Sequence, residues 1–327
     1  MAAPTSVTPE HSRRAATRIF GLGLLATAGA LALASAIIMT FKATAAPGDT
    51  RTLVAAGDLV CSPSTRAYSG SDPKTCQHRL TEDLLAGADA VATLGDLQYP
   101  DGRLEFFNQA YHKTWGQHVA KTFPVPGNHE YNTPRAQGYF DYWASHGRPT
   151  GGAGNGYYGF DLGSWHVIAL NSSRSCDEVP CREGSAQNNW LESDLAGTTE
   201  SCILAYWHHP RFNSGTGHGE TLKTGALWDD LYAARADIIL NGHEHNYQRY
   251  AKQNPDGKAA SNGIREFIVG SGGRGLTALG QRDPNFEVGN DRDFGVLKLT
   301  LAPSSYSWQF VGVGGRVLDS GGPVACN

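Results

Sequence analysis

Several features that would assign this 327-residue chain to a common class are missing. Its 27 basic and 31 acidic residues are interspersed, the formal net charge is −4, and no basic stripe could hold a nucleic-acid backbone. No Cys-x-x-Cys pair is present, which disfavours a cysteine metal site. Beyond residue 46 there is no internal repeat, long linker or low-complexity segment. The sequence therefore contains no sign of a nucleic-acid-binding module, and nothing in it points to a protein partner.

Two kinds of catalytic site are also disfavoured. The glycine-rich stretch Gly270–Gly275 lacks the lysine and the following helix of a phosphate-binding P-loop, so we predict that it is a turn. No serine or cysteine lies in a setting that would activate it as a nucleophile, which argues against covalent acyl chemistry.

The N-terminal segment has the order of an export signal. Arg13, Arg14 and Arg18 precede an apolar run over Ile19–Phe41, and small residues follow at 43–46. The run is also long enough to cross a bilayer, so a retained anchor is the alternative. We predict an export signal or membrane anchor over 1–46, a catalytic domain over 47–327, and a secreted or cell-envelope location. Membrane contact is expected only if the segment is retained.

The cysteines all follow this segment. An even number of cysteines in an exported chain predicts disulfides. Short separations favour Cys61–Cys76 and Cys176–Cys181, which leaves Cys202–Cys326 as the third pair.

Apolar, β-prone runs alternate with helical patterns, which predicts an α/β fold with both sheet faces covered. Later runs rich in β-branched and aromatic residues suggest a second sheet packed on the first. The expected fold is a layered α/β/β/α sandwich with two packed mixed β-sheets flanked by helices. Strands are expected at 52–56, 90–94, 123–125, 165–170, 203–207, 237–240, 264–269, 296–301 and 307–313, and helices at 81–88, 104–119 and 227–236.

Five polar motifs follow one another in the chain, namely Gly57-Asp58, GDLQY, GNHE, WHHP and GHEH, and four of them come directly after an apolar run. In α/β folds, sites form at the carboxyl ends of the strands. Carboxylate, phenol and amide oxygens together with imidazoles are numerous enough here to hold two metal ions. The candidate ligands are Asp58, Asp96, Tyr99, Asn128, His208, His243 and His245.

Spacing separates some ligands from their neighbours. His243 and His245 are two residues apart and lie on one side of an extended loop. Of His208 and His209, at most one is expected to be a ligand, and His129 points away from its neighbour Asn128. The remaining histidines are expected to be hydrogen-bonded or surface groups; they are His78, His112, His118, His146 and His166.

The ordered series GD…GDxxY…GNH[ED]…H…GHxH resembles the binuclear metallophosphoesterases, from about Arg51 to the C-terminus. The tyrosine is similar to that of the purple acid phosphatase branch, and the bacterial type of signal resembles exported actinobacterial members. The resemblance implies that Asp96 bridges two metals. It implies that the first metal is completed by Asp58, Tyr99 and His245, and the second by Asn128, His208 and His243.

The resemblance also implies proton donors and metal identities. His129 and His218 would protonate or stabilise the leaving group. Tyr99 favours Fe(III) at the first position, with Zn, Mn or Fe(II) at the second. At the first motif the family usually has Asp-x-Gly, whereas this chain has Asp58-Leu59-Val60, so packing near the first metal is expected to differ. The absence of histidine at Val60 disfavours the Asp-x-His diesterase variant.

The expected activity is hydrolysis of phosphate monoesters by a metal-bound hydroxide at a binuclear centre, with a small phosphorylated molecule as substrate. One alternative is phosphodiesterase or nucleotidase action at the same metals. A second is a non-catalytic envelope protein that binds metal or phosphate. The sequence leaves the natural substrate, the pH optimum and the oligomeric state open.

Overall fold

The structure is a computed structural model that describes residues 41–42, 49–69, 72, 74–152 and 154–327. Nearly all of the predicted leader over 1–46 lies outside these residues. None of the helices within the described ranges has the length and apolar character that a bilayer span requires.

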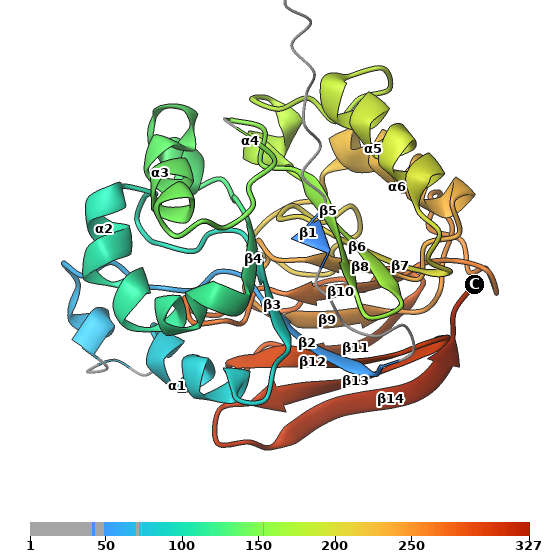
Figure 1. Ribbon diagram of the computed structural model, residues 1–327. Helices are drawn as coiled ribbons and strands as arrows, with labels where there is room; N and C mark the ends of the chain where they lie inside the picture. The colour runs from blue at the N-terminus through green and yellow to red at the C-terminus, as the bar shows by residue number, and fades with distance from the viewer. Residues whose placement is uncertain (1–40, 43–48, 70–71, 73, 153) are drawn as a thin grey trace, which may run out of the picture. The chain divides into compact units, whose positions relative to one another are not determined.

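Two mixed sheets form the centre of the fold (Figure 1). The six-stranded sheet has the order β14-β13-β12-β2-β3-β4. Its strands are β2 (Arg51–Ala56), β3 (Ala90–Leu94), β4 (Thr122–Val125), β12 (Gly295–Ala302), β13 (Ser305–Gly312) and β14 (Val317–Ala325).

The eight-stranded sheet has the order β1-β5-β6-β7-β8-β10-β9-β11. Its strands are β1 (Phe41–Lys42), β5 (Tyr158–Leu162), β6 (Trp165–Ala169), β7 (Cys202–Tyr206), β8 (Ile238–Asn241), β9 (Tyr247–Tyr250), β10 (Arg265–Val269) and β11 (Phe286–Asn290).

The prediction of two packed mixed sheets is confirmed, but the late strands do not form a second sheet by themselves. β12 pairs antiparallel with β2, with Leu299 opposite Leu53, so β12 to β14 extend the sheet of the early parallel strands. β10 instead pairs parallel with β8. Every residue of β3, β6, β7 and β8 is buried, as expected for strands covered on both faces.

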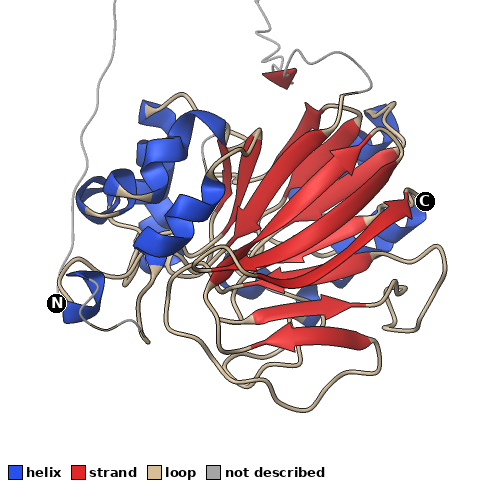
Figure 2. Ribbon diagram, turned by 90° about the horizontal axis from the view of Figure 1, so that it is seen from below, coloured by secondary structure: helices blue, strands red, loops and turns tan. Residues whose placement is uncertain are grey.

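Helices flank the strands, which form a central block in Figure 2. α5 and α6 lie together and pack apolar residues, among them Leu191 and Trp228, against the eight-stranded sheet. α2 and α3 contact each other and contribute aromatic residues such as Phe107 and Trp143 to the larger core cluster. The helices are α1 (His78–Glu82), α2 (Leu104–Gln109), α3 (Gln137–Ser145), α4 (Ser173–Cys176), α5 (Ala186–Gly197) and α6 (Gly225–Ala233).

The prediction of one continuous helix over 104–119 is wrong, because the segment is divided into three shorter helices. α2 ends at Gln109, and two 3₁₀ helices follow, η3 (Tyr111–Lys113) and η4 (Trp115–Lys121). The backbone N–H of Tyr111 donates to the side-chain oxygen of Gln98 at 3.1 Å instead of to a carbonyl within the helix. A side chain that lies outside the segment, 13 residues before Tyr111, thus interrupts a segment whose local pattern is helical.

The predicted disulfide pairing is confirmed. All six cysteines are paired, as Cys61–Cys76, Cys176–Cys181 and Cys202–Cys326. The third pair joins the start of β7 to the chain beyond β14, across 124 residues of sequence.

His166 on β6 is hydrogen-bonded, as expected for a histidine outside the motifs, and joins β5 to α5. Its ring nitrogens lie 2.9 Å from Asp161 Oδ1 and 2.8 Å from Asp194 Oδ2. Burial disfavours the charged imidazole, but the hydrogen bonds to Asp194 and Asp161 outweigh burial and raise the pKa of His166 above its ordinary value. Such a charge stabilises the fold fully below the unfolded-state pKa, and this contribution is lost as pH rises through the folded-state pKa.

We therefore expect His166→Gln to lower the free energy of unfolding by about 2 kcal/mol in mildly acidic solution, because two charge-assisted hydrogen bonds are weakened. The difference between wild type and variant should shrink in alkaline solution, where His166 is neutral. Urea unfolding with intact disulfides, measured across this pH range, tests the prediction. A difference that is independent of pH would contradict it.

Candidate metal centre

The candidate ligands lie where strands of both sheets end. Asp58 and Asp96 each come two residues after a strand of the six-stranded sheet, and His208 and His243 each come two residues after a strand of the eight-stranded sheet. Asn128 follows β4. The oxygen donors thus come from one sheet, whereas the imidazoles come from the other.

Three of these residues have left-handed backbone conformations, with φ of 58° at Asp58, 51° at Asp96 and 70° at His243. Such a conformation costs free energy in a residue other than glycine and is concentrated at functional sites. Gly95 is required next to Asp96, because its φ is +85° and a Cβ there would lie 2.6 Å from His208 Nδ1.

One group of donor atoms surrounds the hydroxyl of Tyr99. This oxygen lies 3.0 Å from Asp58 Oδ1, 3.1 Å from Asp96 Oδ2 and 3.1 Å from His245 Nε2. His245 Nε2 is also 3.3 Å from Asp58 Oδ1. The four residues that the family resemblance assigned to the first metal therefore lie together.

A second group surrounds His208 Nε2. This nitrogen lies 3.1 Å from Asn128 Oδ1, 3.2 Å from His243 Nδ1 and 3.5 Å from Asp96 Oδ2. Asp96 Oδ2 belongs to both groups, so the structure brings all seven candidate ligands into one cluster with Asp96 at its centre.

The donor set fits cations. His208 Nδ1–H donates to the carbonyl oxygen of Leu94 at 2.7 Å, and His245 Nδ1–H donates to that of Gly275 at 2.9 Å. In the neutral imidazoles, Nε2 of each ring is then a lone-pair acceptor that faces carboxylate, phenol or amide oxygens. Metal-binding histidines are commonly oriented by such hydrogen bonds to the other ring nitrogen. Among the described residues, no lysine or arginine pairs with Asp58 or Asp96.

The buried carboxylates and imidazoles of the cluster shift one another's pKa values. Burial alone would raise the pKa of Asp96, but the imidazoles of His208 and His129 outweigh it and hold this pKa well below its ordinary value. Burial opposes the charge on His208, yet Asp96 and Asp58 raise its pKa to about 9. Burial and the carboxylates of Asp58 and Asp96 raise the pKa of Tyr99 well above its usual range.

Glu130 of the GNHE motif, which the sequence analysis did not single out, holds two motif loops together. Its fully buried carboxylate accepts the backbone N–H groups of Asp96 and Leu97, each at 2.9 Å, of Gln98 at 3.3 Å and of Gly127 at 2.8 Å. The signal for it in the sequence was its place within the GNHE motif, two residues after the candidate ligand Asn128.

The two predicted proton donors lie at the exposed side of the cluster. His129 Nδ1–H donates to the carbonyl oxygen of Pro100 at 2.7 Å, and its Nε2 is 3.8 Å from Asp96 Oδ2. The exposed ring of His218 stacks on His243 at a centroid distance of 4.3 Å and lies 5.4 Å from the ring of His245. Neither imidazole contributes to the two groups of polar atoms around the Tyr99 hydroxyl and His208 Nε2, although the ring of His129 packs against that of Tyr99 at a centroid distance of 4.3 Å.

His209 lies nearer to the cluster than the sequence suggested. Its ring is buried 4.3 Å from that of His243, and Nδ1 lies 2.8 Å from Ser172 Oγ. Burial and the neighbouring His208 lower the pKa of His209 well below its usual value, which keeps the ring neutral. His208 faces Asn128 and Asp96 directly, and we therefore retain it as the candidate ligand of this pair.

The Gly270–Gly275 stretch is a loop with no helix after it, so it does not have the structure of a P-loop. It packs against the first motif, where the N–H of Arg274 donates to the carbonyl oxygen of Asp58 at 2.8 Å. A Cβ at Gly270 would lie 2.8 Å from Asp58 Oδ2. The loop thus supports Asp58, and its Gly275 carbonyl orients His245.

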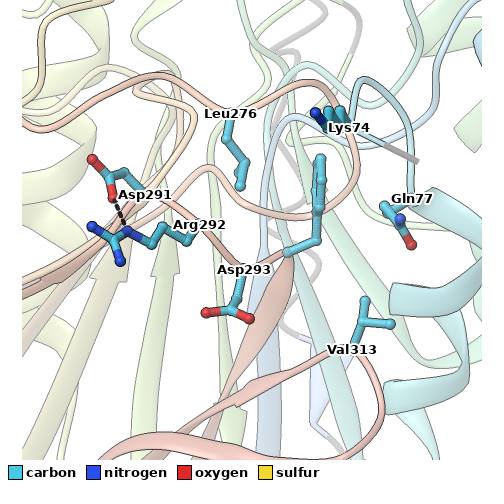
Figure 3. A pocket seen from close by; sticks show the side chains of 8 residues that line it. Lys74, Gln77, Leu276, Asp291, Arg292, Asp293 and Val313 are labelled. Carbon is cyan, nitrogen blue, oxygen red and sulfur yellow. Dashed lines mark ion pairs between the residues drawn. The ribbon is translucent and has the colours of Figure 1, made fainter. Parts of the chain in front are cut away.

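A cavity of about 440 Å³ lies beside this loop, with Leu276 in its wall (Figure 3). Its other lining residues include Lys74 and the oppositely charged pair Asp291 and Arg292. None of the candidate ligands lines it, and it is therefore distinct from the metal centre.

Comparison with known proteins identifies the family. The family profile described as calcineurin-like phosphoesterase matches residues 35–247, which is more than half of the chain. The chain belongs to the calcineurin-like phosphoesterase family.

Purple acid phosphatases are among its relatives. The chain is 28% identical to purple acid phosphatase 18 of Arabidopsis thaliana over 267 residues, which cover 75% of this chain and 58% of the relative. It is also 28% identical to a nucleotide pyrophosphatase/phosphodiesterase of Hordeum vulgare, with coverage of 74% and 73%. The chain spans about half the length of most of the curated relatives that it matches.

Solved structures confirm the fold. Purple acid phosphatase PPD1 from yellow lupin (Lupinus luteus) seeds matches with a TM-score of 0.69 at 20% identity, over 84% of this chain and 53% of that chain. GAP50, the anchor in the inner membrane complex of Plasmodium, matches with a TM-score of 0.62 at 14% identity, over 85% and 89%. At these identities the likeness shows the shared layered fold alone.

Removal of metal should destabilise the protein, because the buried acceptor atoms then repel one another or must bind protons. We expect a chelator to lower the melting temperature by about 5 °C or more, measured by calorimetry. Since His208 has a pKa of about 9, a metal must displace its proton below that pH, and the metal-dependent gain should shrink on acidification. A melting temperature that is indifferent to the chelator at all pH values would contradict this.

Proposed function

We propose that the protein hydrolyses phosphate monoesters at a binuclear metal centre. The observation that carries the proposal is the position of Asp96 Oδ2, which lies 3.1 Å from the Tyr99 hydroxyl and 3.5 Å from His208 Nε2. One carboxylate oxygen shared by two groups of donors is the arrangement that two neighbouring cations require. Membership of the calcineurin-like phosphoesterase family supports metal-dependent phosphoester hydrolysis.

Each group of donors would hold one ion. The first ion would be held by Asp58, Tyr99 and His245 together with Asp96, and the second by Asp96 together with Asn128, His208 and His243. Two such ions polarise a phosphate ester, offset its negative charge and lower the pKa of water. The chain holds the metal-binding side chains in position before an ion binds. The carbonyls of Leu94 and Gly275 orient His208 and His245, and the carboxylate of Glu130 holds the backbone at Asp96.

His129 and His218 are the proposed proton donors to the leaving group. The hydrogen bond from His129 Nδ1 to Pro100 leaves Nε2 directed at the cluster. His218 is exposed and stacked on His243, so it can reach a bound ester from the side of the second ion. A positioned histidine typically accelerates such proton transfer by about 10²–10⁴-fold.

A second candidate is phosphodiesterase or nucleotidase action at the same centre. It is favoured by the Hordeum vulgare relative named as a nucleotide pyrophosphatase/phosphodiesterase, which the chain covers more fully than it covers the phosphatase from Arabidopsis. We prefer the monoester because Val60 occupies the position where the diesterase variant has histidine. A non-catalytic role as a metal- or phosphate-binding envelope protein is disfavoured because a mere binder needs no proton donors.

We further propose an extracytoplasmic location. Three disulfides support it, since such bonds persist in oxidising compartments. The export signal or anchor over 1–46 and the likeness to actinobacterial members stay predictions from the sequence.

The first test of the function is turnover of p-nitrophenyl phosphate by metal-loaded protein, with Asp96→Asn beside it. Loss of the shared carboxylate should lower the rate by about 10³-fold or more. Asp256→Asn is a matched control, because this carboxylate is 71% exposed and, within the described part of the chain, forms an ion pair with one exposed lysine, Lys258. Equal turnover in wild type and Asp96→Asn would mean that the site is elsewhere, and activity on diesters alone would favour the second candidate.

Metal identity gives a separate prediction. We propose Fe(III) at the Tyr99 position and Zn, Mn or Fe(II) at the second, because a phenol with a raised pKa ionises only beside a strong Lewis acid. The iron-loaded protein should then show a visible tyrosinate-to-iron absorption band that Tyr99→Phe abolishes. A colourless iron-loaded protein, or a band that survives in Tyr99→Phe, would refute this assignment.

A further inference from the structure

Glu244 lies between the candidate ligands His243 and His245 in the GHEH motif, and the proposed function gives it no role. Its side chain is fully buried. A buried carboxylate is costly unless donors surround it, so the partners of Glu244 indicate what it does.

Four donors converge on this carboxylate. Oε1 accepts the N–H of Gly217 at 3.0 Å and the hydroxyl of Thr277. Oε2 accepts the N–H of His218 at 2.8 Å and Nδ2–H of Asn213 at 3.0 Å. An ionised carboxylate is an acceptor at both oxygens, and this set of donors therefore matches it.

These bonds fix the loop that carries His218. Asn213 Nδ2–H also donates to the carbonyl oxygen of His218 at 2.6 Å, so both backbone groups of His218 are held. The loop lies directly on the carboxylate, because a Cβ at Gly215 would be 2.2 Å from Glu244 Cδ and one at Gly217 would be 2.9 Å from Oε1.

A second loop is tied to the same carboxylate. Thr277 donates its hydroxyl to Glu244, and its backbone N–H donates to the carbonyl oxygen of His245 at 2.9 Å. Glu244 thus connects the loop of His218 to the turn that carries His243, and the ring of His218 stacks on His243 at 4.3 Å as a result.

We infer that Glu244 is a positioning residue that holds His218 in place to protonate the leaving group. The inference rests on the proposed function. Glutamine at this position has nearly the same shape, but one of its two terminal atoms is an NH₂ group, which donates and cannot accept. This group must face either Gly217 and Thr277 or His218 and Asn213, and that pair of donors then loses its acceptor. Glu244→Gln therefore breaks about half of the network and loosens the loop that carries His218, without removing any candidate ligand.

Leaving groups of different basicity separate this role from a general structural one. A proton donor matters most for a poor leaving group such as an alkoxide, and least for p-nitrophenolate. We expect Glu244→Gln to lower kcat for glycerol phosphate by about 10²–10⁴-fold and to lower that for p-nitrophenyl phosphate much less. His218→Ala should show the same pattern, and the double variant should lose no more than His218→Ala alone.

Hydrogen exchange provides a readout that does not depend on activity. In Glu244→Gln, the amide of Gly217 or His218 that faces the new NH₂ group should exchange faster than in wild type, because that N–H loses its acceptor, whereas Asp256→Asn should leave both amides unchanged. Metal content is measured on the same samples, and two ions per chain are expected in all variants.

The outcomes distinguish the inference from the function on which it rests. A wild type that hydrolyses neither ester would refute the proposed function, while exchange would still test whether Glu244 holds the loop. Equal losses on both esters, additive losses in the double variant, unchanged exchange, or loss of metal from Glu244→Gln would overturn the inference. If Glu244→Gln does not fold, Asn213→Ala, which removes the bonds from Asn213 to the carbonyl of His218 and to Glu244, carries the same kinetic expectations.

Discussion

The constraint on which this structure depends is the mutual approach of lone-pair acceptors in its centre. The Tyr99 hydroxyl lies 3.0–3.1 Å from atoms of Asp58, Asp96 and His245. His245 Nε2 lies 3.3 Å from Asp58 Oδ1, and His208 Nε2 lies 3.1 Å from Asn128 Oδ1. Such atoms repel unless protons or cations lie between them. Two features hold these acceptor atoms together against the repulsion. Backbone carbonyls orient the imidazoles of His208 and His245, and the carboxylate of Glu130 binds the backbone of two motif loops.

The same constraint couples the site to the fold. Oxygen donors come from the six-stranded sheet and imidazoles from the eight-stranded sheet, so any bound cation would join the two sheets. Left-handed backbone at Asp58, Asp96 and His243 adds local cost at the strand ends, which the surrounding buried strands outweigh. Stability and metal binding are therefore expected to be properties of one assembly.

Local sequence predicted the parts of the molecule that depend on local physics. Strands such as β3 (Ala90–Leu94) end where the apolar run ends, and turns after glycine place Asp58 and Asp96 at those ends. Features that depend on contacts between separate segments were not predicted. The pairing of β12 with β2 depends on register between segments far apart, and the break after α2 depends on the side chain of Gln98. The roles of Glu130 and Glu244 depend on donors from other loops.

The most direct test of the central claim is anomalous X-ray diffraction from crystals of the purified protein, with data collected at the absorption edges of iron, zinc and manganese. The account predicts two metal peaks per chain, both within coordination distance of the Asp96 carboxylate, with Tyr99 bound to one and His208 to the other. A single peak, or peaks that do not contact Asp96, would contradict it.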